Sequence, residues 1–130
     1  KLLFRIPDIE ELPKDKLVEL YQNSKIGFNV HMSYGPSNLR LYELPMNGVM
    51  QICDCTEGLS KLYQIDKEVV SYGTINEAID KIEYYLKNDN KRMEIASAGH
   101  EKVHHCYKAE NSFKVLFSEI NSDLKKINRQ

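Results

Sequence analysis

The side chains best suited to binding chemistry gather between His31 and Glu43. Residues 31–37, His-Met-Ser-Tyr-Gly-Pro-Ser, combine an imidazole, hydroxyl groups and a glycine just before a predicted helix start at Asn38. Free amides at a helix N-terminus bind anions, phosphate above all, and Gly35 lets the backbone approach such a ligand closely. Glycine-containing loops before helices are common, so this pattern by itself is a weak signal for a phosphate site.

Two charged residues follow this loop. The guanidinium of Arg40 could pair with a phosphate oxygen or with a neighbouring carboxylate. Glu43 lies one helical turn further on, and a carboxylate that accepts two hydrogen bonds suits a vicinal diol such as a ribose. The plain alternative is a solvated Glu43, or a structural ion pair between Glu43 and Arg40, and the residue types leave these readings open.

The cysteines and histidines raise the question of a metal site. Cys53 and Cys55 form a Cys-x-Cys pair, but two thiols do not complete a tetrahedral zinc site, and Cys53 is more simply a small buried strand residue. A second group lies on one predicted helix and consists of His100, His104, His105 and Cys106. His100 and His104 are one helical turn apart. We predict no metal ligands in either group.

The elements that must position these residues follow from apolar periodicity. Short apolar runs predict strands at residues 1–6, 25–30, 49–53 and 69–72. A helix is predicted at 14–24, a short one directly after Asn38, and another short one that ends at Leu62. Pro45 should keep the helix after Asn38 short, and Gly48 is placed to end it in a left-handed cap. Alternating strands and helices predict an α/β fold with a Rossmann-like parallel sheet and flanking helices over residues 1–73.

The remainder, residues 74–130, is predicted to be helical, so the chain reads as a single partial domain with a helical C-terminal end. Apolar stripes at 75–86 and 113–127 are expected to face the core, with the last one packing on another domain as the alternative. Ligands of open parallel sheets bind beyond the carboxyl ends of the strands. The loop that begins at His31 and the loop that begins at Asp54 should therefore face the same edge, where His31 is a candidate contact and Asp54 is expected to cap its turn.

Bulk composition excludes several classes of protein. The 130 residues are 42% apolar and 28% charged with a net charge of −1, which gives no electrostatic argument for nucleic acid or an anionic membrane. No apolar run reaches the roughly 20 residues of a membrane span, so no transmembrane segment is predicted. Three cysteines without a disulfide pattern favour a cytoplasmic location. Because Lys1 opens the chain, we expect it to be part of a longer one.

The stretch from Asn38 to Asp54 resembles the donor domain of GT-B glycosyltransferases of group 1, and is most similar to the family related to spore-maturation glycosyltransferases. That family carries the pattern N-x-R-x-(F/Y)-E-x-P/A-x-x-G before a buried strand ending in Asp. The matching residues are Asn38, Arg40, Tyr42, Glu43, Pro45, Gly48 and Asp54. Weaker similarity extends the match over roughly residues 24–107.

The resemblance implies a nucleoside diphosphate sugar as donor substrate, with no metal and no other cofactor. Glu43 would bind the ribose, and the diphosphate would lie against the residues around it: His31, Gly35, Ser37, Asn38 and Arg40. Many relatives carry a second glutamate at the position of Gly35, so the contact to the sugar departs from the family pattern here. The resemblance assigns no catalytic residue, and it implies an acceptor domain N-terminal to this chain, without which the fragment should not transfer sugar.

Two alternatives stay open. The same fold could serve as a non-catalytic binding or regulatory module, since one of the two glutamates is replaced. A flavodoxin-like or receiver-like domain would need an acidic cluster after the first strand, for which residues 7–11 are a faint candidate, and three successive C-terminal helices fit that class poorly.

Overall fold

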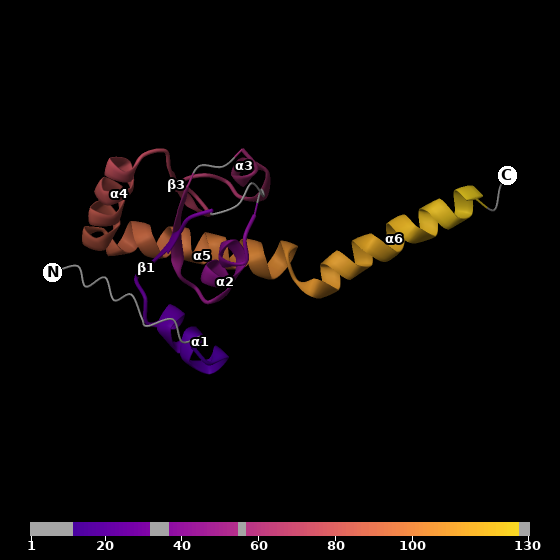
Figure 1. Cartoon of the computed structure of the whole chain (residues 1–130), viewed down its shortest axis with the longest axis horizontal. Coiled ribbons are helices and arrows are strands. Elements are labelled where there is room, and N and C mark those ends of the chain that lie inside the picture. The colour runs from indigo at the N-terminus through magenta and orange to yellow at the C-terminus, as the bar shows by residue number, and fades with distance from the viewer. Residues whose placement is uncertain (1–11, 32–36, 55–56, 128–130) are drawn as a thin grey trace.

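The computed structural model describes residues 12–31, 37–54 and 57–127, and these form an α/β fold with a Rossmann-like parallel sheet (Figure 1). The elements follow one another as α1 (Lys14–Gln22), β1 (Ile26–Asn29), α2 (Arg40–Met46), β2 (Met50–Asp54), α3 (Leu59–Leu62), β3 (Val70–Tyr72), α4 (Ile75–Lys87), α5 (Asp89–Cys106) and α6 (Ala109–Ile127). The predicted α/β fold class is confirmed, and each predicted helix and strand of the described residues occurs within a few residues of its expected place. The strand predicted at residues 1–6 and the acidic segment 7–11 lie outside the described residues.

The sheet of the described residues has the order β1-β2-β3, with both pairs parallel. Asn29 at the end of β1 is paired with Cys53, and Cys53 is paired with Ser71 of β3. The carboxyl ends of the strands therefore meet at one edge, and the residues that follow β1 and β2 lie beside each other there.

Both faces of the sheet are covered by helices. One apolar cluster lies on the side of α2 and α3 and consists of Leu41, Cys53, Leu59, Tyr63, Val69 and Val103. The other lies on the side of α4 and consists of Met50, Ile52, Val70, Tyr72, Ala78 and Ile95. The long helix α5 contributes Ile95 to one cluster and Val103 to the other, so it ties both faces of the sheet together.

Helix α2, which carries the predicted site residues, is short for the expected reason. Pro45 lacks the amide hydrogen that would bond to the carbonyl of Leu41, and the buried hydroxyl of Tyr63 donates to that carbonyl instead, at 2.6 Å. Gly48 has a φ of +74°, so the predicted left-handed glycine after the helix is confirmed. A Cβ at Gly27 would lie 2.5 Å from the Leu44 side chain, which shows how closely α2 packs on β1.

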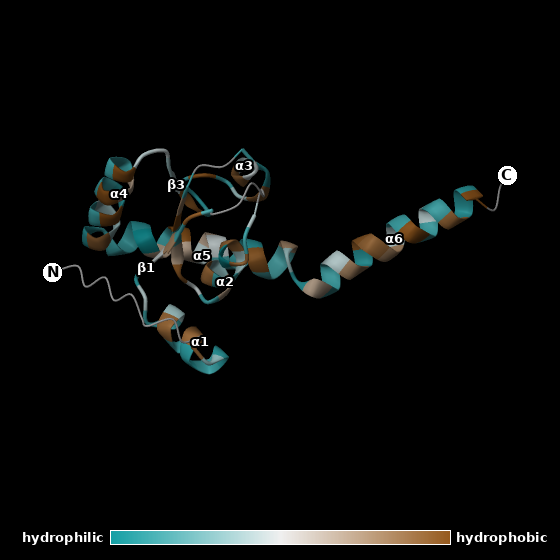
Figure 2. Cartoon of the chain, viewed as in Figure 1, coloured by the Kyte–Doolittle hydropathy of each residue, from teal (hydrophilic) through white to brown (hydrophobic). Residues whose placement is uncertain are grey.

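The C-terminal helix α6 departs from expectation. It extends away from the sheet with its apolar stripe uncovered (Figures 1 and 2), and Phe113 and Phe117 remain 56% and 59% exposed. The expectation that the stripe at 113–127 is core was wrong for the described residues, because periodicity marks an amphipathic helix but not what covers it. The prediction that the apolar stripe of α4 faces the core is correct in part, since Ala78 is buried but Ile75 and Ile79 are exposed.

None of the helices in the described residues is both long enough and apolar enough to cross a membrane.

Candidate functional site

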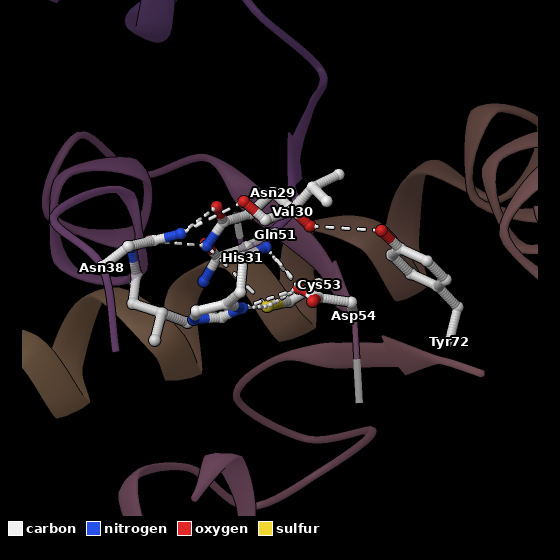
Figure 3. Close-up of polar contacts among 9 residues, drawn as sticks. Asn29, Val30, His31, Asn38, Gln51, Cys53, Asp54 and Tyr72 are labelled. Atoms are coloured by element: carbon white, nitrogen blue, oxygen red, sulfur yellow. Dashed lines mark hydrogen bonds and ion pairs between the residues drawn. The ribbon is translucent and has the colours of Figure 1, made fainter. Parts of the chain in front are cut away.

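His31 and Asp54 meet where β1 and β2 end (Figure 3). The Nδ1 atom of His31 lies 2.7 Å from Oδ1 of Asp54, and the backbone N–H of His31 donates to both carboxylate oxygens at 3.1 Å. The expectation that these two loops face the same edge is confirmed for the residues at which they begin, His31 and Asp54. Asp54 was expected to cap its own turn, which includes residues outside the described ranges, and its carboxylate holds His31 at the start of the loop after β1.

These contacts also set the ionisation of Asp54. Burial would raise the pKa of this carboxyl, but hydrogen bonds from the ring and the backbone of His31 and from the Cys53 thiol outweigh it and hold the pKa below its usual value. Asp54 is therefore a carboxylate at neutral pH. A carboxylate next to an imidazole ring favours the tautomer with its proton on Nδ1.

The thiol of Cys53 lies close to both side chains of this pair. Its Sγ atom is 3.4 Å from Oδ1 of Asp54 and 3.8 Å from Nδ1 of His31, and the residue is fully buried, as predicted for a strand position. A thiol, an imidazole and a carboxylate thus come together at the end of the sheet, a juxtaposition that the Cys-x-Cys spacing did not indicate.

Asn29, the last residue of β1, connects this group to helix α2. Its Nδ2 atom lies 3.0 Å from Asn38 Oδ1, 3.1 Å from Gln51 Oε1 and 3.7 Å from Cys53 Sγ, so three acceptors share its two hydrogens. Asn29 and Gln51 are buried in the sheet and were not predicted as site residues, because polar residues inside a predicted strand carry no signal of where their side chains converge. The usable signal would have been two carboxamides in strands that otherwise consist mostly of apolar residues.

Asn38 was predicted as the N-cap of α2, and the N-cap position lies one residue later, at Leu39. The Oδ1 of Asn38 accepts from the backbone N–H of Leu41 at 3.2 Å, which holds the first turn of α2, and the Asn38 amide donates to Asn29 Oδ1 at 2.9 Å. Both polar atoms of this side chain are thus engaged inside the protein. Asn38 positions the N-terminus of α2 over the end of β1.

The other predicted residues lie on and before α2. Ser37 and Arg40 are exposed, and Glu43 is half-buried in the first turn of the helix. Gly35 lies outside the described residues. The ion pairs of the described residues include none between Arg40 and Glu43, so the structural pair considered as an alternative is not formed there.

Glu43 lies beside Tyr21, a half-buried residue of α1. Burial raises the pKa of the Tyr21 hydroxyl in α1, the Glu43 carboxylate adds to this shift, and Arg40 opposes it. The carboxylate therefore lies beside Tyr21, at the contact of α1 with α2. Glu43 is neither a fully solvated helix residue nor the partner of Arg40.

His100 of α5 packs against the end of α2. His100 Nδ1 lies 2.9 Å from the carbonyl oxygen of Pro45, and the rings of His100 and His104 are 4.2 Å apart. Desolvation, followed by the proximity of His100, lowers the pKa of His104. His100 thus ties α5 to the end of α2.

Two buried polar atoms beside the site have no hydrogen-bond partner within the described ranges: Nε2 of His31 and Nε2 of Gln51. Buried polar groups are paired in most proteins, and exceptions gather at binding and catalytic sites. Both atoms belong to the group that Asn29 connects.

The comparisons with known proteins bear on this edge of the sheet. The family model described as glycosyl transferase-like matches residues 3–117. The chain belongs to the glycosyl transferase-like family. The match spans the whole sheet, helix α2 and the site at the carboxyl ends of β1 and β2. The comparison with curated proteins gave no match.

Membership of the glycosyl transferase-like family confirms the predicted glycosyltransferase resemblance over most of the chain. It indicates a transferase. Open parallel sheets bind ligands at the carboxyl ends of their strands. His31, Asn38 and Asp54 all lie at that edge.

Proposed function

We propose that this chain binds the donor of a glycosyl transfer reaction, a nucleoside diphosphate sugar, at the carboxyl edge of its sheet. The observation that carries the proposal is the contact between His31 and Asp54 at that edge, with Asn38 bonded to the neighbouring Val30 carbonyl, in a member of the glycosyl transferase-like family. Ligand sites of parallel sheets lie at such edges.

The ribose is assigned to Glu43. Its carboxylate is half-buried, and no ion pair with Arg40 competes for it within the part of the chain that the structure describes. A carboxylate beside the Tyr21 hydroxyl already has a partner on one side and can accept from two ribose hydroxyls on the other. Burial of part of the side chain reduces the competition with water and strengthens such bonds.

The diphosphate is assigned to the residues before and at the start of α2. Ser37 and Arg40 are exposed there, and a guanidinium can bind phosphate oxygens through two parallel hydrogen bonds. His31 is included because it opens the loop that leads to α2, where Asp54 holds its backbone N–H. Gly35 completes the predicted loop. Asn38 contributes indirectly, since its side chain holds the first turn of α2 in place.

Transfer of the sugar requires an acceptor and is proposed for a chain that also contains an acceptor-binding half. The residues described here would supply donor binding and stabilisation of the leaving diphosphate, whose charge grows as the glycosidic bond breaks. A non-catalytic binding module remains the alternative, and it makes the same prediction for nucleotide binding but no prediction of transfer.

Calorimetry with nucleoside diphosphates tests the assignment of Glu43. The Glu43→Gln variant keeps the shape and an acceptor for Tyr21 but removes the charge, so nucleotide binding should weaken by about 1.5–3 kcal/mol, roughly 10- to 150-fold. Glu83→Gln is the matched control, because Glu83 is an exposed glutamate of α4. Equal nucleotide affinities of the wild type and Glu43→Gln would contradict the assignment.

A further inference from the structure

Three side chains at the end of the sheet offer three different kinds of metal ligand to one point in space. The Nδ1 atom of His31, the Sγ atom of Cys53 and a carboxylate oxygen of Asp54 all lie within 4.8 Å of one another (Figure 3). Within the described ranges, this is the group of histidine, cysteine and acidic residues that converges closely enough to hold an ion. Its members come from the ends of two adjacent strands, β1 and β2, so the sheet itself fixes their relative positions.

The distances between the ligand atoms approach those of a tetrahedral zinc site. Zinc bonds of about 2.0–2.3 Å at a tetrahedral angle separate a sulfur from a nitrogen or oxygen ligand by roughly 3.6 Å. Sγ of Cys53 lies 3.8 Å from Nδ1 of His31 and 3.4 Å from Oδ1 of Asp54. The distance from Nδ1 to Oδ1, 2.7 Å, is that of a hydrogen bond, and it would open by roughly 0.6 Å once an ion replaced the shared proton.

We propose that His31, Cys53 and Asp54 form a binding site for a divalent ion of the zinc class. A thiolate, an imidazole and a carboxylate together favour zinc or cobalt over magnesium or calcium, which prefer oxygen ligands. Three protein ligands leave one tetrahedral position open, as in zinc sites that bind water or a substrate atom.

Neighbouring groups already support these ligands as a metal site requires. The backbone N–H of His31 donates to both carboxylate oxygens of Asp54 at 3.1 Å, and Oδ1 also faces the ring and the sulfur. The amide of Asn29 donates to Sγ of Cys53 at 3.7 Å, and such a donor stabilises a thiolate. Contacts of this kind orient metal ligands and contribute substantially to metal affinity.

Binding requires a defined movement of protons. Cys53 releases its thiol proton to solvent when Sγ bonds to the ion, and the proton on Nδ1 of His31 passes to Nε2, so that Nδ1 is free to coordinate. Asp54 is already ionised and loses nothing. The His31 ring needs no large movement, because its side chain is 5% exposed and its Nδ1 edge faces Cys53 and Asp54.

Cobalt absorption tests this site directly. Co²⁺ added to the reduced, metal-free chain should bind at one equivalent and produce a sulfur-to-cobalt charge-transfer band, which Zn²⁺ should then remove by displacement. Cys53→Ser should abolish the charge-transfer band, and Asp54→Asn should weaken Co²⁺ binding at least about tenfold. Calorimetry in two buffers of different ionisation enthalpy should show about one proton released for each ion bound.

The controls separate this site from the other thiols. Cys106→Ser changes an exposed cysteine at the end of α5 and should leave the band unchanged, and Cys55→Ser tests the neighbouring thiol in the same way. Absence of a saturable band in the wild type, or an unchanged band in Cys53→Ser, would overturn the proposal. If Cys53→Ser does not fold, as judged by circular dichroism, then Asp54→Asn decides, and unchanged Co²⁺ affinity in that variant overturns the proposal. The site does not depend on the proposed function, because nucleotide binding to Glu43 can be measured in the presence of a chelator.

Discussion

At the scale of single residues, the contact between His31 and Asp54 defines the site. Each of these residues was predicted to follow a strand, but their direct contact was not predicted. It depends on the register between β1 and β2, which pairs Asn29 with Cys53, and residue spacing along the chain does not fix that register. The contact of Asn38 with Leu41, three residues later, is local, and the sequence predicted the start of α2 to within one residue of its N-cap, Leu39.

The lowered pKa of Asp54 predicts an effect on stability in acid. A carboxyl whose pKa is lower in the folded state contributes stability above its ordinary value of about 3.9, and this contribution is lost as the pH falls through the folded-state pKa. Asp54→Asn should therefore reduce the free energy of unfolding at pH 5–7. It should also flatten the loss of stability below about pH 4, by at most about 1.4 kcal/mol per pH unit.

Urea unfolding of both proteins across pH 3–7 measures this difference. Asp123→Asn is the control, because Asp123 is an exposed carboxylate on α6. Parallel curves for the wild type and Asp54→Asn over the whole range would show that the contact with His31 does not stabilise the folded state.

At the scale of elements, helix α2 shows how one residue compensates for another. Pro45 leaves the Leu41 carbonyl without its helical donor, and the hydroxyl of Tyr63, from the segment after α3, replaces it. The short helix was predicted from Pro45. The compensating donor lies 22 residues away from Leu41, so it could not be predicted from the local sequence. The same helix carries Glu43 and Arg40, so this hydrogen bond helps to position both.

Tyr63→Phe should lower the free energy of unfolding by about 1–3 kcal/mol, because it leaves a buried carbonyl without a donor. In a Pro45→Ala background, the restored amide of residue 45 can donate to Leu41, so Tyr63→Phe should cost less there. Chemical denaturation of the four proteins of this double-mutant cycle gives the coupling energy. Additive effects of the two substitutions would contradict the compensation.

At the scale of the whole molecule, helix α6 differs from the sheet and its flanking helices in how much of it is buried. The strands, α2 and α5 share two buried clusters, whereas α6 contributes no buried residue. The α/β architecture could be predicted from periodicity, because buried strands and their crossover helices leave apolar patterns in the chain. The surroundings of α6 could not, since an apolar stripe at helical spacing is the same whether it faces a core or another domain. Packing of this stripe on a further domain stays a prediction, as does the division into parts at residues 73 and 74.

Shortening the chain after Lys108 should therefore leave its free energy of unfolding within about 0.5 kcal/mol of the wild-type value, the range of changes at exposed sites. Removal of exposed side chains such as Phe113, Phe117 and Ile120 should also reduce self-association. Denaturant unfolding and light scattering measure the two effects. A loss of several kcal/mol would show that α6 supports the fold.

The central claim is that a nucleotide binds at the carboxyl edge of the sheet, and amide nuclear magnetic resonance during a titration with a nucleoside diphosphate tests it most directly. The largest shift changes should fall on the ends of β1 and β2 and on the start of α2, at residues 29–31, 37–43 and 53–54, and should saturate together. The amides of α4 and α6 should remain unchanged. Saturable changes confined to α4, α5 or α6, or no saturable change with any nucleoside diphosphate, would contradict the account.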